Sequence, residues 1–553
     1  TDLSGKFRYA TFGANSPGAA DLDVQDLIVG LETVATTKEG GYMWNPTVVA
    51  AHDETDNADG TRTYTVKIQE DLVFSDGSPV TAKNYLVSLL TFSTPVAAQA
   101  AGKDHMAGMT YVGFEDFNAY TGPGSEAGKK EFSGVRLIDD YTFSVTVAAD
   151  YLPYFYAITY GGFSATPVAQ YLGTCDILDD GNGVYLSDEF YAKDGDSYTM
   201  AQHIYDGAWN KDNTFPYSGP YTVESWNESD KSVVLVANPN FKGNYEGTKP
   251  GIQKVVYKRM VTETQIADFT SGGLDVLAGI TGGDETKAAL ALVESDPTRY
   301  AETHYDRAGY GKLAFRCDLG PTAMTEVRQA IIYTINRPEF AQTFTGGYGS
   351  VVNGPYYEGF SAFKANADTI NLNDYAYSAD DAVAVLEEGG WIYNDKGQQF
   401  VPGTDAVRYK KLSGYELSAQ NLQYSSIDGA YKTLKINGEY YMPLAINWYG
   451  TQPNTVTDQL ITAWQTNPNA TTELGMYIGY TSCDFTTGLY GEYLQIEAYG
   501  WDGVAKCAAI NFATGFNSAI YDQSWYWTIN QDMYADYSNN YMMDEADFWE
   551  NYQ

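Results

Sequence analysis

Basic residues are scarce in this chain. It has 33 Lys and Arg against 71 Asp and Glu, so its formal net charge is −38. Nucleic-acid phosphates and anionic membrane surfaces are bound through Lys and Arg, and this balance argues against both as partners. The acidic excess is typical of a well-solvated surface on a secreted protein. An acidic ligand site is the alternative interpretation of the same composition.

Cysteine, histidine and long apolar runs are also in short supply. Four cysteines in 553 residues do not make a disulfide scaffold; Cys483 and Cys507 are candidates for a pair whose geometry the sequence leaves open. The four histidines show no metal-ligand spacing, so we expect neither a metal nor a cofactor. No apolar run reaches the ~20 residues of a membrane span. A Gly-x-Ser-x-Gly nucleophile elbow and a Walker loop are absent as well.

Apolar and aromatic residues are abundant. Hydrophobic residues make up 44% of the chain and 48 residues are Tyr, which favours a folded protein with more than one domain. Tyrosine suits contacts with peptides or carbohydrates, because its ring stacks and its hydroxyl forms hydrogen bonds; ordinary packing is the alternative. Residues 173–213 are rich in Asp and Gly and are predicted to be a solvated surface insertion.

The stretch Thr63–Tyr85 predicts a strand, a tight turn and the start of a helix. Apolar and polar residues alternate over Tyr64–Ile68, the period of a half-buried strand. Asp76-Gly77 marks the turn, and Thr81 is a candidate N-cap for the helix that follows. The polar run 51–62 before it is predicted to be a hairpin turn.

Further blocks follow in a fixed order. They are PYSGPY at 216–221, EVRQAIIYTINRPEF at 326–340, the helix from Ser378 to Gly389-Gly390-Trp391, the strand MPLAINWY at 442–449 with a helix at 457–465, and INFATGFN at 510–517. Together with Thr63–Tyr85, they resemble the family 5 extracellular solute-binding proteins, the oligopeptide- and dipeptide-binding subunits of ABC importers. The resemblance runs in order over most of the chain.

The resemblance implies an α/β fold of the two-lobed periplasmic-binding-protein type (type II, the large peptide-binder cluster). Mixed β-sheets flanked by helices and an extra outer subdomain in lobe I are expected. Lobe I would comprise residues 1–306, with its core at about 1–50 and 161–306 and the outer subdomain at about 51–160, and lobe II residues 307–553. Only about three dozen residues follow Asn517. The family's closing C-terminal segment is therefore expected to be missing, through truncation or true absence.

The resemblance also implies a function. The chain would be the substrate-binding subunit of an ABC importer that captures oligopeptides in an interlobe cleft by hinge closure and delivers them to a membrane permease. It would be a monomer and not an enzyme. Its location would be extracytoplasmic, lipid-anchored through an upstream cysteine or periplasmic. Two alternatives stay open: the same scaffold binding an oligosaccharide or other neutral solute, and a glycan-active enzyme, which needs two carboxylates at a defined separation.

The resemblance places ligand contacts on a loop of lobe I and on the end of a strand in lobe II. These residues are Asn15, Ser16, Gly18 and Ala19 in the loop and Thr514, Gly515, Phe516 and Asn517 in the strand. Phe516 stands where the family carries Trp, which keeps an aromatic face but loses the indole donor. The family's Asp that pairs with the ligand α-amine aligns with Ala519, and Asp522 is a candidate substitute. Tyr310 and Trp448 are further candidates, with core packing as the alternative.

Overall fold

The computed structural model consists of two compact units, Thr1–Val261 (unit 1) and Thr262–Gln553 (unit 2). It describes residues 3–5, 7, 19–38, 41–101, 106–154, 156–210, 213–261, 263–280, 282–305, 309–354, 364, 366–369, 372–451, 455–465, 473–484, 486–497, 500–504 and 506–515. The predicted lobe boundary between residues 306 and 307 lies further along the chain and stays a prediction. Within these ranges, no helix combines the length and the apolar character that crossing a bilayer requires.

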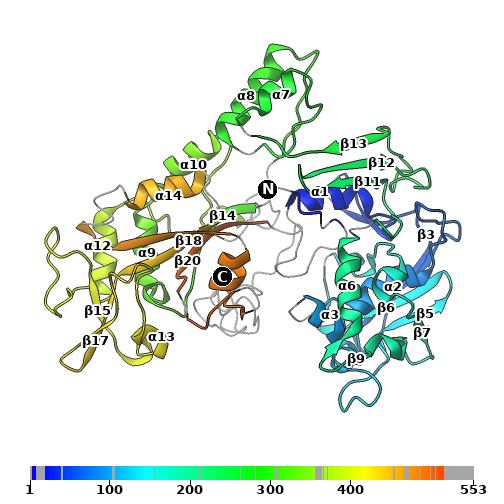
Figure 1. Ribbon diagram of the computed structural model, residues 1–553, viewed down its shortest axis with the longest axis horizontal. Helices are drawn as coiled ribbons and strands as arrows, with labels where there is room; N and C mark the ends of the chain where they lie inside the picture. Colours follow the sequence, from blue (N-terminus) through cyan, green and yellow to red (C-terminus); the bar gives the residue numbers. More distant parts are fainter. Residues whose placement is uncertain are drawn as a thin grey trace. The chain divides into compact units, whose positions relative to one another are not determined.

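Unit 1 is organised around a four-stranded antiparallel sheet in the order β3-β4-β6-β5, drawn in blue and cyan in Figure 1. Its strands are β3 (Val49–Asp56), β4 (Arg62–Ile68), β5 (Val135–Asp139) and β6 (Thr142–Val147). The predicted strand at Tyr64–Ile68 is β4, and its alternate side chains Tyr64, Val66 and Ile68 are fully buried. The prediction of a turn over 51–62 was wrong for its first part, because β3 is an edge strand whose residues after Val49 are all exposed.

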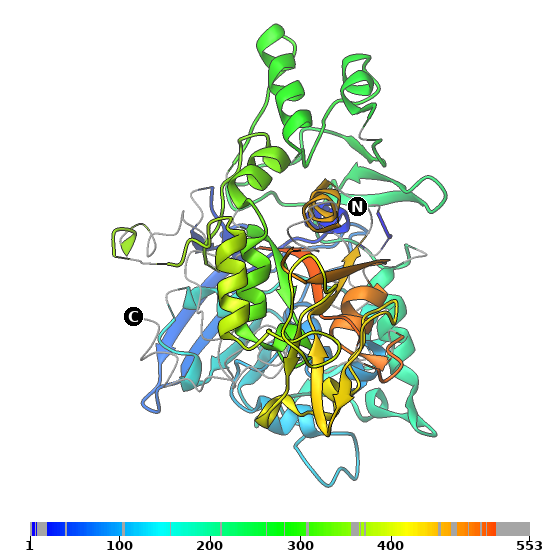
Figure 2. The same ribbon diagram turned by 90° about the vertical axis from the view of Figure 1, so that its left-hand side faces the viewer.

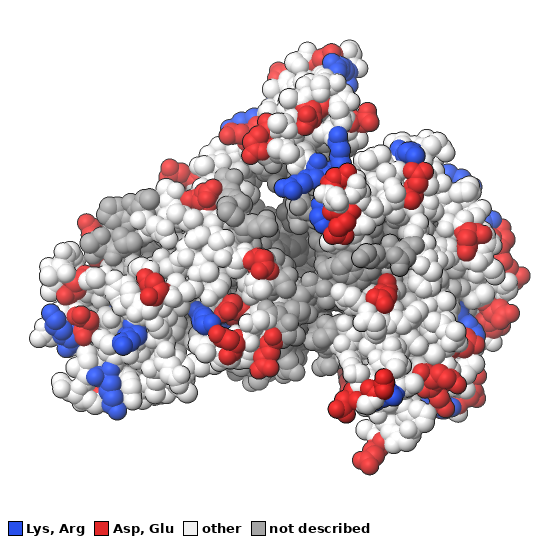
Figure 3. All heavy atoms as spheres, in the orientation of Figure 1, with Lys and Arg blue, Asp and Glu red and all other residues white. Residues whose placement is uncertain are grey.

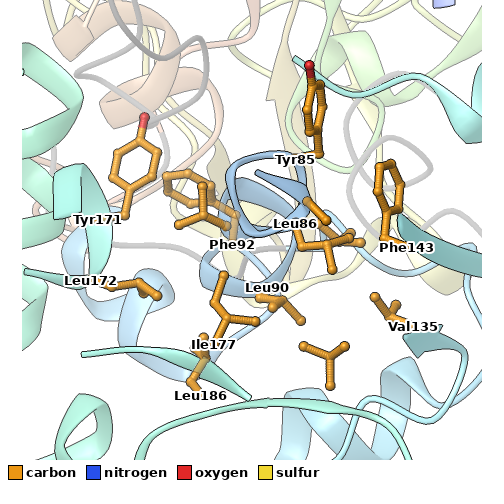
Figure 4. Close-up of a cluster of buried hydrophobic side chains, with 14 of the residues drawn as sticks. Tyr85, Leu86, Leu90, Phe92, Val135, Phe143, Tyr171, Leu172, Ile177 and Leu186 are labelled. Atoms are coloured by element: carbon orange, nitrogen blue, oxygen red, sulfur yellow. The ribbon is translucent and has the colours of Figure 1, made fainter. Parts of the chain in front are cut away.

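The predicted turn and helix after β4 are confirmed. Gly77 has φ +84°, a backbone conformation that residues with a Cβ rarely adopt. The Oδ1 atom of Asn84 accepts the backbone N–H of Thr81 at 2.8 Å, which closes the N-terminus of α2 (Ala82–Thr91). Figure 4 shows Leu86 and Leu90 of this helix in the main core of unit 1, with aliphatic side chains from β5, β7 and β8 beside them.

The remaining elements of unit 1 complete its core. They are α1 (Ala19–Ile28), β1 (Val34–Thr36), β2 (Tyr42–Trp44), α3 (Pro95–Ala101), α4 (Phe114–Ala119), α5 (Val168–Leu172), β7 (Ile177–Asp179), β8 (Val184–Leu186), β9 (Lys193–Asp194), β10 (Ser197–Tyr198), α6 (Thr199–Trp209), β11 (Tyr221–Asn227), β12 (Ser232–Ala237) and β13 (Lys254–Tyr257). The prediction of a solvated insertion at 173–213 was wrong, because Ile177, Phe190 and Ile204 are fully buried in the core.

Unit 2 is organised around a four-stranded mixed sheet in the order β14-β20-β18-β19. Its strands are β14 (Gly309–Phe315), β18 (Ala445–Thr451), β19 (Tyr477–Cys483) and β20 (Ala509–Gly515). Strand β18 runs parallel to β19 and β20, whereas β14 is antiparallel to β20. The prediction of a strand over 442–449 is corrected in one respect, because Pro443 ends β17 and β18 begins at Ala445.

Helices and strands together form the larger core of unit 2. Figures 1 and 2 show α9 (Thr325–Tyr333) and α12 (Ala379–Glu388) side by side, in green and yellow-green. The predicted start of this helix at Ser378 is confirmed, because Ser378 is the N-cap of α12 and its Oγ accepts the N–H of Asp381 at 3.1 Å. The other elements are α7 (Gln265–Thr270), α8 (Gly283–Ser295), α10 (Arg337–Thr345), β15 (Tyr409–Lys411), α13 (Ala419–Leu422), β16 (Leu434–Ile436), β17 (Glu439–Pro443) and α14 (Thr455–Gln465).

Candidate ligand-binding site

Three of the predicted site residues lie together at one end of the unit 2 sheet. In the register of β14 and β20, Tyr310 pairs with Thr514 and Gly309 pairs with Gly515. Because β14 is antiparallel to β20, the first residues of β14 lie beside the last residues of β20. This is the end of the sheet that holds the carboxyl ends of the parallel strands β18, β19 and β20. Ligands of open α/β sheets bind outside the carboxyl ends of such strands. The candidate site is this end of the sheet, at Tyr310, Thr514 and Gly515.

Trp448 lies elsewhere, inside the core. It is 1% exposed and packs edge-on against Trp464 of α14, with ring centroids 5.0 Å apart. Its indole Nε1–H donates to Asn511 Oδ1 at 2.9 Å, so its polar group is already satisfied within the sheet. The core packing that the sequence left open as an alternative describes this residue, and we leave Trp448 out of the proposed site.

Tyr310 shares its face of β14 with a lysine that the sequence did not single out. Lys312 lies two residues further along the strand, and its Nζ is 5.9 Å from the centroid of the Tyr310 ring. Burial lowers the pKa of the Lys312 ammonium group. The next residue on this face, Ala314, is buried in a small cluster with Tyr449, Ile510 and others. Strand periodicity alone gave no signal for Lys312, because its partial burial depends on tertiary packing.

A π-helix covers the same small cluster. It spans Thr486–Tyr493, directly after β19, and contributes Tyr493 to the cluster. Such helices are rare and often occur at functional sites. Two polar atoms at its end, Glu492 Oε2 and Gln495 Nε2, are buried and have no hydrogen-bond partner among the described residues. Burial raises the pKa of Glu492. These unsatisfied polar groups lie near the start of β20 and not at the candidate site, because Tyr493 Oη donates to the carbonyl of Phe315, which pairs with Ala509.

Nucleophilic and metal chemistry find little support in the described residues. All four cysteines are free thiols: Cys483 Sγ donates to the carbonyl of Gly450 and Cys507 Sγ to that of Ala509. The candidate disulfide between Cys483 and Cys507 is therefore not formed. Burial raises the pKa of Cys483 to about 11, which keeps it a poorly reactive thiol. In the described part of the chain, no group of three or more His, Cys, Asp and Glu side chains could hold a metal ion.

The predicted loop of unit 1 is mostly beyond what the structure describes. Ala19 is the first residue of α1, whereas Asn15, Ser16 and Gly18 lie outside the described residues, as do Phe516, Asn517 and Asp522. These residues stay predictions.

The backbone is tightly constrained just after α1. A Cβ added at Gly30 would lie 2.9 Å from the Cα atom of Gly219. The next residue, Leu31, has φ +56°, a strained conformation for a leucine.

A half-buried carboxyl group, that of Glu32, follows this strained residue. Burial raises the pKa of Glu32, and the nearby Asp26 carboxylate raises it further. The charge of Glu32 also acts on Tyr85, whose hydroxyl is buried and has no hydrogen-bond partner within the described ranges. Figure 4 shows the Tyr85 hydroxyl directed away from the aliphatic side chains of the core. Glu32 was not predicted, because nothing in the local sequence distinguishes it from the many surface acids.

Surface charge is spread widely. On the face shown in Figure 3, Asp and Glu side chains are scattered over each unit and do not form a single patch. On this face, the distribution fits the solvated surface that the composition predicts.

The chain matches one family by sequence. Residues 46–482 match the family described as "Bacterial extracellular solute-binding proteins, family 5 Middle". The oligopeptide-binding protein OppA of Lactococcus lactis subsp. cremoris is 25% identical over 378 residues, which cover 65% of this chain and 53% of that relative. The chain thus spans about half the length of the curated relatives it matches first.

Solved structures share the fold at low sequence identity. The oligopeptide-binding protein AppA of Bacillus subtilis, in complex with a nonapeptide, matches with TM-score 0.60 and 16% identity, over 99% of this chain and 82% of that one. Lactococcal OppA, complexed with an endogenous peptide in the closed conformation, also gives TM-score 0.60 and 16% identity, over 96% and 86% of the two chains. These similarities confirm the predicted fold class.

Proposed function

The chain belongs to family 5 of the bacterial extracellular solute-binding proteins, and on this premise we propose that it is the oligopeptide-binding subunit of an ABC importer. The observation that carries the proposal is the family match over residues 46–482. The match includes β14 of the candidate site and ends within β19, before β20 begins. The relatives named oligopeptide-binding proteins favour peptides as the ligand class. The family consists of solute-binding proteins, so the proposed activity is capture and release without a chemical step.

The proposed mechanism is a clamp. A ligand that contacts both lobes lowers the free energy of the closed state only, and this difference drives hinge closure. The closed protein then delivers its ligand to a membrane permease. We place the protein outside the cytoplasmic membrane, either lipid-anchored or periplasmic, and propose that it acts as a monomer.

A neutral solute such as an oligosaccharide is the second candidate ligand. It is favoured by Ala519, which stands where the peptide binders of the family have the Asp that pairs with the ligand amine. Stacking and hydrogen bonds from aromatic and hydroxyl side chains suffice for such a ligand.

Thermal shift with matched panels of peptides and oligosaccharides separates the two candidates. A ligand present at ~100 times its Kd adds ~2.7 kcal/mol to the free energy of unfolding, which raises the melting temperature measurably. We expect stabilisation by peptides. Stabilisation by a glycan alone would move the ligand class to carbohydrates, and release of smaller sugars from that glycan would make the protein an enzyme.

Phe516 provides a test of the strand end. We expect Phe516→Ala to weaken ligand binding about tenfold or more, because an aromatic anchor is lost, without changing the melting temperature of the free protein. Isothermal titration measures the affinity, and circular dichroism follows unfolding. Unchanged affinity would remove Phe516 from the proposed site.

A further inference from the structure

Tyrosine rings gather at one place on the surface of unit 1. We call Tyr42, Tyr154, Tyr156 and Tyr160 the tyrosine cluster; Tyr42 lies on β2 and Tyr160 in the short helix Ala157–Gly161. The Tyr156 ring is edge-on to those of Tyr42 and Tyr154, with centroids 5.2 Å and 6.2 Å apart. The Tyr154 ring also meets that of Tyr160, at 5.4 Å. All of these side chains are half-buried, so each keeps part of its surface in contact with solvent.

Core packing accounts for only one member of the tyrosine cluster. Tyr160 packs against the main core of unit 1, whereas Tyr42, Tyr154 and Tyr156 lie outside the hydrophobic core clusters of the described residues. Within the same residues, the hydroxyl groups of Tyr42 and Tyr154 have no hydrogen-bond partner. Burial raises the pKa of Tyr42, and the hydroxyl groups of Tyr154 and Tyr156 raise it further, because these groups lie close together.

Carboxylates lie near the tyrosine cluster. The Tyr160 hydroxyl donates to the carbonyl of Tyr151 at 3.4 Å, so Tyr151 adjoins the cluster. Burial raises the pKa of Tyr151, and the carboxylates of Asp150 and Glu115 raise it further. Together with the net charge of −38, these carboxylates favour a positively charged ligand at this surface.

A tyrosine ring elsewhere in unit 1 already binds a cation. Lys130 Nζ lies 4.0 Å from the centroid of the Tyr185 ring. The negative face of an aromatic ring attracts a cation that lies within about 6 Å of its centroid. In the described part of the chain, no lysine or arginine takes this position at Tyr42, Tyr154 or Tyr160. The faces of these rings are therefore not used by the protein's own cations.

We propose that the tyrosine cluster binds an organic ammonium ion on its outer surface. The ring faces attract the charge, and sets of aromatic rings are a general means of recognising quaternary ammonium groups. Where the ammonium group carries N–H donors, the hydroxyl oxygens of Tyr42 and Tyr154 accept them. The inference goes beyond the proposed function, because it concerns unit 1 alone and does not depend on the solute held at the candidate site.

The first experiment compares each cation with an uncharged analogue. Choline is paired with neohexanol, in which carbon replaces the choline nitrogen, and n-butylammonium, which mimics a lysine side chain, is paired with n-butanol. Titrations followed by saturation-transfer difference NMR give the affinities for the free protein. We expect at least one cation to bind about fivefold or more tightly than its analogue, because only the charged compound is attracted by the rings. The pair with the larger ratio identifies the kind of ammonium ion.

The second experiment assigns the binding to the tyrosine cluster. Tyr154→Leu should weaken binding of the cation about fivefold or more, whereas Tyr154→Phe keeps the ring and should retain the preference over the uncharged analogue. Tyr185→Leu is the matched control, because Tyr185 is also a half-buried tyrosine of unit 1 but its ring already binds Lys130. If circular dichroism shows that Tyr154→Leu does not fold, Tyr42→Leu takes its place.

The proposal has clear contrary outcomes. Equal binding of each cation and its uncharged analogue by the unmodified protein would overturn it, as would the absence of binding by both cations. A preference that survives Tyr154→Leu, or that Tyr185→Leu removes to the same extent, would place the cation away from the tyrosine cluster and overturn the proposal as well. None of these outcomes changes the result of the peptide and oligosaccharide panels, so the proposed function is tested separately.

Discussion

Glu32 is one residue whose ionisation we expect to oppose folding. Burial raises the pKa of its carboxyl group above the ordinary value of 4.5, so the folded state binds the proton more tightly than the unfolded state does. Above the folded-state pKa the carboxylate is charged in both states, and its desolvation cost is fully present. As pH falls through the folded-state pKa towards about 4.5, the group becomes protonated in the folded protein and this cost disappears.

Glu32→Gln should therefore raise the melting temperature by a few degrees at neutral pH, and the gain should shrink as pH falls through this window. Calorimetry between neutral and mildly acidic pH measures the difference from the unmodified protein. Glu126→Gln, which changes an exposed loop residue, serves as the control and should leave the difference near zero. A gain that grows towards acidic pH would contradict the direction of the pKa shift.

The turn between β4 and α2 allows a test at the scale of one element. Gly77 donates its backbone N–H to the carbonyl of Phe74. The neighbouring Ser75 donates its backbone N–H to the carbonyl of Tyr217 and accepts the N–H of Tyr217 at its Oγ. A Cβ at Gly77 would meet nothing within 4 Å, so the cost of a side chain there comes from its φ of +84° alone. Gly77→Ala should reduce the free energy of unfolding by about 1 kcal/mol.

Gly251→Ala is the matched control for this turn. A Cβ added at Gly251 would also meet nothing within 4 Å, but the φ of this residue is not left-handed. The substitution should be neutral or slightly stabilising, because alanine reduces the entropy of the unfolded chain. Urea denaturation measures both variants. Equal effects of the two substitutions would show that the backbone conformation of Gly77 carries no special cost.

Elements were predictable where local pattern and capping agree. Periodicity and turn chemistry predict the strand at Tyr64–Ile68, the N-caps Thr81 and Ser378, and strand β20. Edge strand β3 was not predicted, because both of its faces are exposed, which leaves no alternation of polar and apolar residues.

The candidate site was predictable in part. Tyr310, Thr514 and Gly515 were predicted to contact ligand, and the structure brings them to one end of the unit 2 sheet. Lys312 and Glu32 were missed, since partial burial of a charge arises from packing between distant segments.

Charge repulsion acts on the molecule as a whole. A net charge of −38 opposes compaction, and the opposing energy falls as salt shortens the Debye length from about 30 Å at 0.01 M to about 8 Å at 0.15 M. Adding sodium chloride over this range should therefore raise the melting temperature of the free protein. An uncharged osmolyte at the same osmolarity is the control for effects unrelated to charge. An unchanged or lower melting temperature would show that ion pairs lost to screening outweigh the repulsion.

The strand order of unit 2 has a consequence for how the chain is made. Strand β20 lies between β14 and β18, so β14 has no neighbour in this sheet until the chain has reached Gly515. The main sheet of unit 1, by contrast, is complete once Val147 has emerged. Because synthesis proceeds from the N-terminus and non-local pairing is slow, the sheet that bears the candidate site should form after the main sheet of unit 1. A nascent chain of this protein would thus stay unable to hold its ligand until Gly515 has emerged.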